Sequence, residues 1–449
     1  MDNTTIAAIA TAPGHGAIGI VRLSGPSARA IGEQISGKTL QPRHATYADF
    51  QNSQQQSIDQ GLILFFPASH SFTGEDCIEL QAHGGPVILD QLLEACLHRG
   101  AVLARPGQFS ERAFLNDKID LTQAEAIADL IAATSRQSAH NALQSLQGVF
   151  SERVNALAAA ILKLRIYVEA AIDFPEEEID FLQDETVAAQ LTTLRQQNTA
   201  LLADAEQGAL LRDGIRVVIA GKPNAGKSSL LNTLSEKNSA IVTAIAGTTR
   251  DILRETINID GLPLHIVDTA GLRDDPDTVE AIGIERAQAE IKTADIVLWL
   301  VDSQQQASHD LPSLWSQHHL CDREKIIVVM NKIDLSKLPA GLQQAEAPTV
   351  VHVSLTSGAG LDDLKQSLKT KAGLNPDSGA NFTARRRHLD ALRRCTNCLA
   401  TGQQRLSEGA GELLAEDLRQ AHQHLGEITG QVSADDLLGE IFSSFCIGK

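Results

Sequence analysis

The feature that most constrains this chain is a phosphate-binding motif at residues 221–228, which has the sequence G-K-P-N-A-G-K-S and matches the pattern G-x-x-x-x-G-K-S. An apolar run at residues 215–220 precedes it, and leucines at helical spacing follow it. This order predicts a strand, a glycine-rich loop and a helix, in which backbone N–H groups and the helix N-terminus surround phosphate oxygens. We expect Lys227 to neutralise the β- and γ-phosphates of a nucleotide and the Ser228 hydroxyl to bind Mg²⁺.

Three further motifs follow, each after an apolar run that predicts a strand. Residues 268–271 have the sequence D-T-A-G, residues 331–334 the sequence N-K-I-D, and residues 354–356 the sequence S-L-T. Ligands of α/β sheets bind at the carboxyl ends of the strands. The four motifs therefore predict one shared nucleotide site.

Asp334 is the residue that we expect to select the base. Its carboxylate can accept hydrogen bonds from both N1–H and N2–H₂ of guanine, a pair of donors that adenine does not offer. Asp268 is expected to act on Mg²⁺ through water, and the Gly271 amide to contact the γ-phosphate. Thr249, between the first two motifs, is placed to reach Mg²⁺. The set predicts a domain that binds and hydrolyses GTP.

The group that orients the attacking water is left open by these motifs. Ras-like enzymes use a glutamine directly after D-x-x-G, and this chain has Leu272 there. Either another group of the chain orients the water, or a partner does.

The segment before this region has a different character. Residues 1–118 predict a mixed α and β domain, with short strands at 18–23, 61–66 and 78–82 and a helix at 86–97. The glycines at 14, 16 and 19 match G-x-G-x-x-G, but they lead into a strand, whereas a dinucleotide-binding fold needs a helix there.

Helical periodicity flanks the α/β region on both sides. It begins near residue 121, where Thr122 and Glu125 resemble a capping box, and it returns after a linker-like stretch at 375–379. One interpretation is an α/β domain inserted into a helical domain, and the other is two unrelated helical segments. Periodicity alone leaves both open.

Composition limits the partners and the compartment. The formal net charge is −18, which argues against strong stand-alone binding to a polyanion such as RNA. The six cysteines are scattered, no run of 18 apolar residues occurs, and the first residues do not resemble a signal peptide. We expect a cytoplasmic protein without a membrane span.

With these residues in view, the chain resembles the MnmE (TrmE) family of bacterial tRNA-modification GTPases over essentially its whole length. The matching motifs lie at residues 221–229, 245–251 and 268–273, at 72–76 and 109–116 in the N-terminal part, and in the tail F-C-I-G-K at 445–449. The resemblance implies a multidomain α/β fold in which a Ras-like P-loop GTPase domain is inserted into a helical-bundle domain. The implied limits are 1–118 for a mixed α+β folate-binding and dimerisation domain, 119–213 and 375–449 for the two helical parts, and 214–374 for the GTPase domain.

The resemblance also implies an activity. Family members are K⁺-dependent GTPases that form homodimers and act with an FAD-dependent partner, MnmG (GidA), in a hetero-oligomer. Together they add an aminomethyl or carboxymethylaminomethyl group at C5 of the wobble uridine of certain tRNAs, with a one-carbon unit from a tetrahydrofolate derivative, in the 5-formyl or methylene form. The alternative is a GTP-dependent switch or ribosome-assembly factor without covalent chemistry.

Residue roles are carried over only onto matching positions. The implied folate contacts are Arg22, Glu79, Lys118 and Lys449. The implied K⁺ ligands are Asn224, Thr243, Ile245 through its carbonyl, and Thr248, while Mg²⁺ falls to Ser228 and Thr249. Glu280 is the implied water-orienting carboxylate, which acts beside Lys227, and a catalytic role is suspected for Cys446. The motifs and the resemblance together place GTP contacts at Asn224, Ala225, Gly226, Lys227, Ser228, Ser229, Thr243, Ala244, Ile245, Ala246, Gly247, Thr248, Thr249, Asp268, Thr269, Ala270, Gly271, Asn331, Lys332, Asp334, Ser354, Leu355 and Thr356.

Overall fold

The structure is a computed structural model that describes residues 4–173, 185–222, 224–236, 254–268, 290–304, 322–375, 381–431, 435–443, 445 and 448. The chain divides into two compact units, each discontinuous in sequence. One comprises residues 1–128, 145–194 and 394–449, and the other comprises 129–144 and 195–393. The limits expected at residues 118, 213 and 374 divide the chain more finely and stay a prediction.

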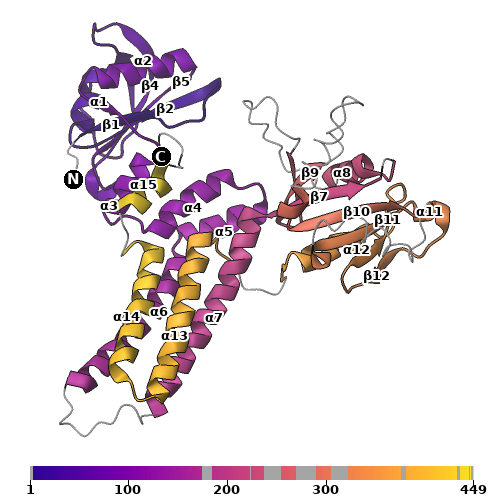
Figure 1. Ribbon diagram of the computed structural model, residues 1–449. Helices are drawn as coiled ribbons and strands as arrows, with labels where there is room; N and C mark the ends of the chain where they lie inside the picture. Colours follow the sequence, from indigo (N-terminus) through magenta and orange to yellow (C-terminus); the bar gives the residue numbers. More distant parts are fainter. Residues whose placement is uncertain are drawn as a thin grey trace, which may run out of the picture. The chain divides into compact units, whose positions relative to one another are not determined.

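A six-stranded sheet with the order β3-β4-β5-β2-β1-β6 forms the N-terminal part of the first unit. Its strands are β1 (Ile6–Ile9), β2 (Gly16–Ser24), β3 (Thr46–Gln51), β4 (Ser57–Phe66), β5 (Cys77–Gly84) and β6 (Val102–Leu103). Neighbouring strands are antiparallel, except that β1 and β6 are parallel. Helices α1 (Ala28–Ser36) and α2 (Pro86–Leu97) pack on the sheet, and a short 3₁₀ turn, η1, spans Ala68–His70 (Figure 1). Apolar side chains of both layers, such as Phe50 and Leu80, form one buried core.

The elements expected in this part are present. Helix α2 has the bounds that periodicity predicted, and β2 begins at Gly16, so the glycine-rich stretch does lead into a strand. Strands β1, β3 and β6 and helices α1 and α3 (Gln108–Leu115) were not predicted, because elements this short do not show a clear apolar period.

Helix α3 ends the N-terminal part. Seven helices of the described residues belong to the helical segments: α4 (Leu121–Ala132), α5 (Arg136–Leu146), α6 (Val149–Asp173), α7 (Glu185–Asp213), α13 (Arg386–Ser407), α14 (Gly411–Thr429) and α15 (Asp435–Ser443). Helix α6, which precedes the α/β region, packs against α14, which follows it (Figure 1). The two helical stretches therefore meet in space, and the inserted domain is the correct alternative. No helix among the described residues is long and apolar enough to span a membrane.

The capping box of α4 lies two residues before the predicted one. The Asp120 carboxylate accepts a hydrogen bond from the Gln123 backbone N–H at 2.9 Å, and the Gln123 side-chain oxygen accepts one from the Asp120 N–H at 2.9 Å. Thr122 and Glu125 are buried within the helix instead. The sequence pattern misplaced the cap because Asp120 and Gln123 have the same three-residue spacing as Thr122 and Glu125.

A seven-stranded sheet forms the core of the second unit, with the order β12-β13-β11-β10-β7-β9-β8. Its strands are β7 (Ile215–Gly221), β8 (Arg254–Ile259), β9 (Leu262–Asp268), β10 (Ile296–Asp302), β11 (Ile326–Asn331), β12 (Gly341–Gln344) and β13 (Thr349–His352). The five central strands are parallel, and β8 and β12 are antiparallel edges. Helices α8 (Lys227–Glu236), α11 (Ile333–Ser336) and α12 (Leu361–Lys371) and the 3₁₀ turn η5 (Arg323–Lys325) complete the described part of this domain (Figure 1). The strands expected before the four motifs are all present.

An ionic cluster joins the segment that enters the α/β domain to the segment that leaves it. The Asp129 carboxylate, 6% exposed, accepts hydrogen bonds from Arg212 at 2.8 Å and from Arg385 at 2.7 Å. Arg212 lies at the end of α7, just before β7, and Arg385 just before α13. The ion pair with Asp129 thus holds the end of α7, directly before the strand β7 that leads to the phosphate-binding motif.

Candidate functional site

A cavity of the second unit lies where the sequence motifs meet. It has a volume of about 630 Å³ and lies at the carboxyl ends of β7 and β11. Its lining comprises Asn224, Gly226, Lys227, Ser228, Ser229, Asn331, Lys332, Asp334, Leu335, Leu355 and Thr356. All but Leu335 were predicted as GTP contacts, so the fold brings three separate motifs to one cavity.

Asn331 holds the phosphate-binding loop against the other two motifs. Its side-chain amide donates to the Ala225 carbonyl at 2.9 Å, and its side-chain oxygen accepts from the Leu355 N–H at 3.3 Å. Gly226 has φ +104°, and a Cβ there would lie 2.4 Å from the Asn331 Nδ2 atom. Only glycine therefore permits this approach at position 226.

A hydrogen bond orients the Asp334 carboxylate, the group expected to bind the guanine base. The Ser354 hydroxyl, which is buried, donates to the Asp334 Oδ1 atom at 2.7 Å. The hydroxyl also accepts from the Ser357 N–H at 3.3 Å, which closes the loop that follows β13. A carboxylate fixed in this way at the cavity wall can present its other oxygen to a pair of N–H donors.

Lys332 is held by a residue that the sequence interpretation missed. Its Nζ atom contacts the Asp302 Oδ2 atom at 2.7 Å, and its backbone has φ +66°. Burial raises the pKa of the Asp302 carboxyl, but hydrogen bonds from Lys332 and from the Gln304 N–H outweigh that effect and hold the pKa below its ordinary value. Asp302 ends β10, the strand beside β11, so its place at a strand end was the available signal.

Replacement of Asp302 by alanine should weaken GDP binding about tenfold, because Lys332 would lose a charged hydrogen bond that fixes it at the cavity wall. Competition against a fluorescent GDP derivative measures this. Ser303→Ala is the matched control, since the Ser303 hydroxyl pairs with Ser336 at 2.8 Å. Equal GDP affinity in the two variants would contradict the positioning role.

The phosphate end of the cavity carries Lys227, Ser228 and Asn224. The Lys227 ammonium donates to the carbonyls of Gly221 and Lys222, at 2.8 and 3.1 Å. Asn224 has φ +63°, a conformation that asparagine adopts more readily than most residues. Their hydroxyl, amide and ammonium groups are of the kinds that bind phosphates and hard cations.

Part of the predicted site lies outside the described residues. This applies to Thr243, Ala244, Ile245, Ala246, Gly247, Thr248, Thr249, Thr269, Ala270, Gly271, Leu272, Glu280, Cys446 and Lys449. Asp268 is described as the last residue of β9, which ends beside β7.

A second group of predicted residues meets in the N-terminal sheet. Arg22 on β2 and Glu79 on β5 are directly opposite in register, and the Arg22 Nη2 and Nε atoms contact the Glu79 Oε1 atom at 2.9 and 3.1 Å. Arg22 also donates to the Gly448 carbonyl at 3.3 Å, so the C-terminal tail lies at this pair. The side chains are 26% and 18% exposed, which leaves them accessible to a ligand.

Lys118 contacts a different segment. Its Nζ atom donates to the Ser69 carbonyl at 3.3 Å, and the residue is exposed. The Arg22 guanidinium lies over the Phe109 ring at 5.9 Å, a distance at which a cation and an aromatic face attract. The sequence did not predict Phe109 as a contact of this site, although Phe109 begins the family motif at residues 109–116.

Two family models match the chain. The model described as MnmE helical domain matches residues 121–446, and the model described as GTP-binding protein TrmE N-terminus matches residues 5–118. Their limits fall close to the change of character near residue 118.

Curated relatives match over the whole length. Proteins named "tRNA modification GTPase MnmE" from Pseudomonas putida (strain W619) and from Chromohalobacter salexigens are 59% and 58% identical to this chain, and the alignments cover 99% of it and 99% and 98% of the relatives. The protein of the same name from Vibrio cholerae serotype O1 (strain El Tor Inaba N16961) is 57% identical over an alignment of 454 residues that covers 100% of both chains.

Proposed function

The chain belongs to the MnmE family of tRNA modification GTPases, and from this premise we propose that it hydrolyses GTP with K⁺ and Mg²⁺ as one half of a folate-dependent enzyme that modifies the wobble uridine of tRNA. The observation that supports the GTPase half is the cavity in which base-selecting and phosphate-binding residues meet. Asp334 and Lys227 both line it.

The described residues of the cavity fit both cations. Asn224 and Ser228 both line the cavity, and the amide oxygen and the hydroxyl that they carry are hard oxygen donors, which suit Mg²⁺ and K⁺. We assign Mg²⁺ to Ser228 and Thr249, and K⁺ to Asn224, Thr243, Ile245 and Thr248. Bound K⁺ supplies positive charge beside the phosphates, where other GTPases use an arginine.

The chain's own groups then have defined tasks. Lys227 exchanges its two carbonyl contacts for phosphate oxygens when GTP enters, and Asp334 holds guanine. Glu280 orients the attacking water, which answers the problem posed by Leu272.

The chemistry of Arg22, Glu79 and the two lysines proposed with them suits a folate ligand. A partly exposed carboxylate such as Glu79 can accept hydrogen bonds from the N–H groups of a pterin ring, and cations such as Lys118 and Lys449 suit the carboxylates of the folate tail. Arg22 connects this pair to the C-terminal tail that carries Cys446. A bound 5-formyl- or methylene-tetrahydrofolate supplies the one-carbon unit, and the tail residue Cys446 is our candidate for a catalytic role near it.

The partners follow from the same premise. We propose a homodimer that joins the FAD-dependent protein MnmG and meets tRNA mainly through that complex. The net charge of −18 supports this division, because an acidic chain gains RNA affinity when a partner contributes positive surface.

Nucleoside analysis of tRNA tests the proposed function directly. Cells that lack this protein should lose the aminomethyl and carboxymethylaminomethyl groups at C5 of the wobble uridine, and expression of the wild-type chain should restore them. Chromatography of digested tRNA measures both. Normal C5 modification in the deletion strain would refute the enzyme and favour the alternative, a GTP-dependent assembly factor.

A further inference from the structure

We propose that Arg112 and Glu75 form a positioning pair that sets the geometry of the folate site. This inference rests on the proposed folate assignment of Arg22, Glu79 and Lys118. It adds a buried ionic network that connects the elements on which those residues lie.

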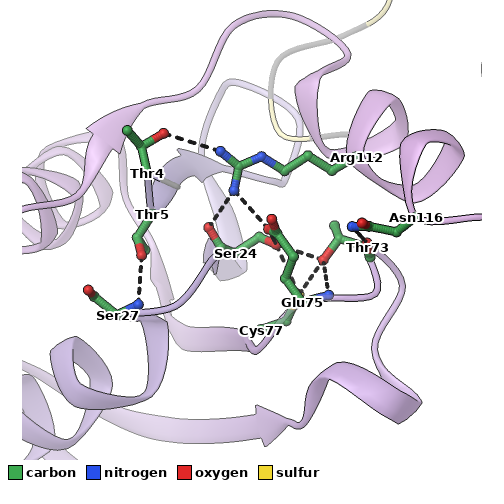
Figure 2. Close-up of polar contacts among 9 residues, drawn as sticks. All are labelled: Thr4, Thr5, Ser24, Ser27, Thr73, Glu75, Cys77, Arg112 and Asn116. Carbon is green, nitrogen blue, oxygen red and sulfur yellow. Dashed lines mark hydrogen bonds and ion pairs between the residues drawn. The ribbon is translucent and has the colours of Figure 1, made fainter. Parts of the chain in front are cut away.

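The network is centred on the Arg112 guanidinium, which is 8% exposed (Figure 2). Its Nη1 atom donates to the Glu75 Oε2 atom at 2.7 Å and to the Ser24 carbonyl at 3.2 Å, and its Nη2 atom donates to the Thr4 Oγ1 atom at 3.3 Å. One side chain of α3 therefore holds the start of the chain, the end of β2 and the loop before β5.

Glu75 carries the network onward. The Oε2 atom that meets Arg112 also accepts from the Ser24 hydroxyl at 2.7 Å. That hydroxyl lies 2.6 Å from the Thr73 Oγ1 atom, which in turn lies 3.1 Å from the Cys77 Sγ atom (Figure 2). Ser24, Thr73 and Cys77 are buried. A hydrogen-bonded network of this kind fixes its members more firmly than separate contacts would.

The network lies on the face of the sheet that carries the proposed folate pair. Ser24 is opposite Cys77 in register, and Arg22 is opposite Glu79 on the same two strands. Residues two apart on a strand point to the same face. A shift of Ser24 or Cys77 would therefore move Arg22 or Glu79 with it.

Helix α3 contacts β2 at two residues, Ser24 through Arg112 and Arg22 through Phe109. Phe109 precedes Arg112 by three residues and so shares a helix face with it, and the Phe109 ring lies under the Arg22 guanidinium. The Arg112 ion pair thus fixes the helix whose aromatic ring supports the proposed ligand-binding arginine.

Lys118 is tied to the same loop. The Asn116 side chain donates to the Thr73 carbonyl at 2.7 Å (Figure 2). Gly74 has φ +78°, and a Cβ there would lie 2.8 Å from the Asn116 Cβ atom and 3.3 Å from the Lys118 Cε atom. The loop that Glu75 anchors therefore packs against the Lys118 side chain, and the third proposed folate residue depends on the same pair.

The burial of Arg112 makes this role testable. Its side chain is 8% exposed, whereas that of Glu75 is 23% exposed. Loss of the Glu75 charge leaves the buried guanidinium without its charged partner, so the elements around it must rearrange. Displacement of binding groups by about 1 Å can cost as much as a hundredfold in function. Changes at the pair should reach the folate site although Arg112 and Glu75 belong to the network rather than to the proposed ligand contacts.

The experiment measures the dissociation constant of 5-formyl-tetrahydrofolate by titration calorimetry with the full-length chain. Glu75→Gln, which keeps the side-chain volume, and Arg112→Lys, which keeps the charge, should each raise it about tenfold to a hundredfold. Arg105→Met is the matched control, because Arg105 and Glu111 form an ion pair at 3.1 Å in which the Arg105 side chain is 70% exposed. That control should bind folate as the wild type does.

Two further measurements separate positioning from folding. All titrations are made well below the melting temperature of each variant, and GTP turnover, which depends on the other unit, should be unchanged in all of them. Wild-type affinity in both network variants would overturn the inference while leaving the folate assignment intact. A wild-type chain that fails to bind 5-formyl-tetrahydrofolate would instead overturn the folate assignment, and this inference with it.

Discussion

An Asp334→Asn chain should lose its preference for guanine and prefer xanthine nucleotides. Guanine presents two donors, N1–H and N2–H₂, and an asparagine would offer one acceptor and one donor to them. Both hydrogen bonds lose their charged acceptor, and one guanine donor is left facing the asparagine NH₂ group. This corresponds to about 3–6 kcal/mol, so GTP affinity should fall by roughly two to four orders of magnitude. Xanthine carries an oxygen in place of the 2-amino group and so matches the asparagine amide.

Competition binding with GTP, XTP and ATP measures this change. Ser354→Ala is the control, because it removes the hydroxyl that orients Asp334 at 2.7 Å but keeps the carboxylate. That variant should bind GTP more weakly and still prefer guanine. An unchanged order of affinities in Asp334→Asn would refute the base-selecting role.

GTP turnover should be about a hundredfold faster in K⁺ than in Na⁺ at the same ionic strength. Loss of one well-placed group that stabilises transition-state charge commonly costs two to three orders of magnitude in rate, and the smaller Na⁺ would not meet the same oxygen ligands. Steady-state phosphate release in KCl and NaCl solutions is the measurement. Equal ionic strength removes screening as an explanation.

The control for the cation is a change at Asn224. Its φ of +63° would strain an alanine, whereas glycine tolerates that conformation and still removes the side-chain oxygen. In Asn224→Gly the rates in the two salts should become similar and low. A wild-type chain with equal rates in K⁺ and Na⁺ would defeat the potassium assignment.

Local sequence patterns predicted much of the α/β domain correctly. Strands β7, β9, β11 and β13, which precede the four motifs, were expected from apolar runs, because a buried parallel strand is nearly continuously apolar. Helix α2 was predicted with its bounds. The cap of α4 was misplaced by two residues, because the polar pairs 120/123 and 122/125 have the same spacing.

The sequence by itself determined the chemistry of the nucleotide site, since each motif combines a strand, a turn and a functional side chain within a few residues. Only the tertiary structure decided how distant groups support one another. Asn331 reaches Ala225 across 106 residues, Lys332 reaches Asp302 across 30, and Arg112 reaches Glu75 across 37. The pairing of α6 with α14 also required the fold. Such contacts depend on the packing of separate elements, which no local period records. Of these contacts, the one from Asn331 to Ala225 holds the phosphate-binding loop.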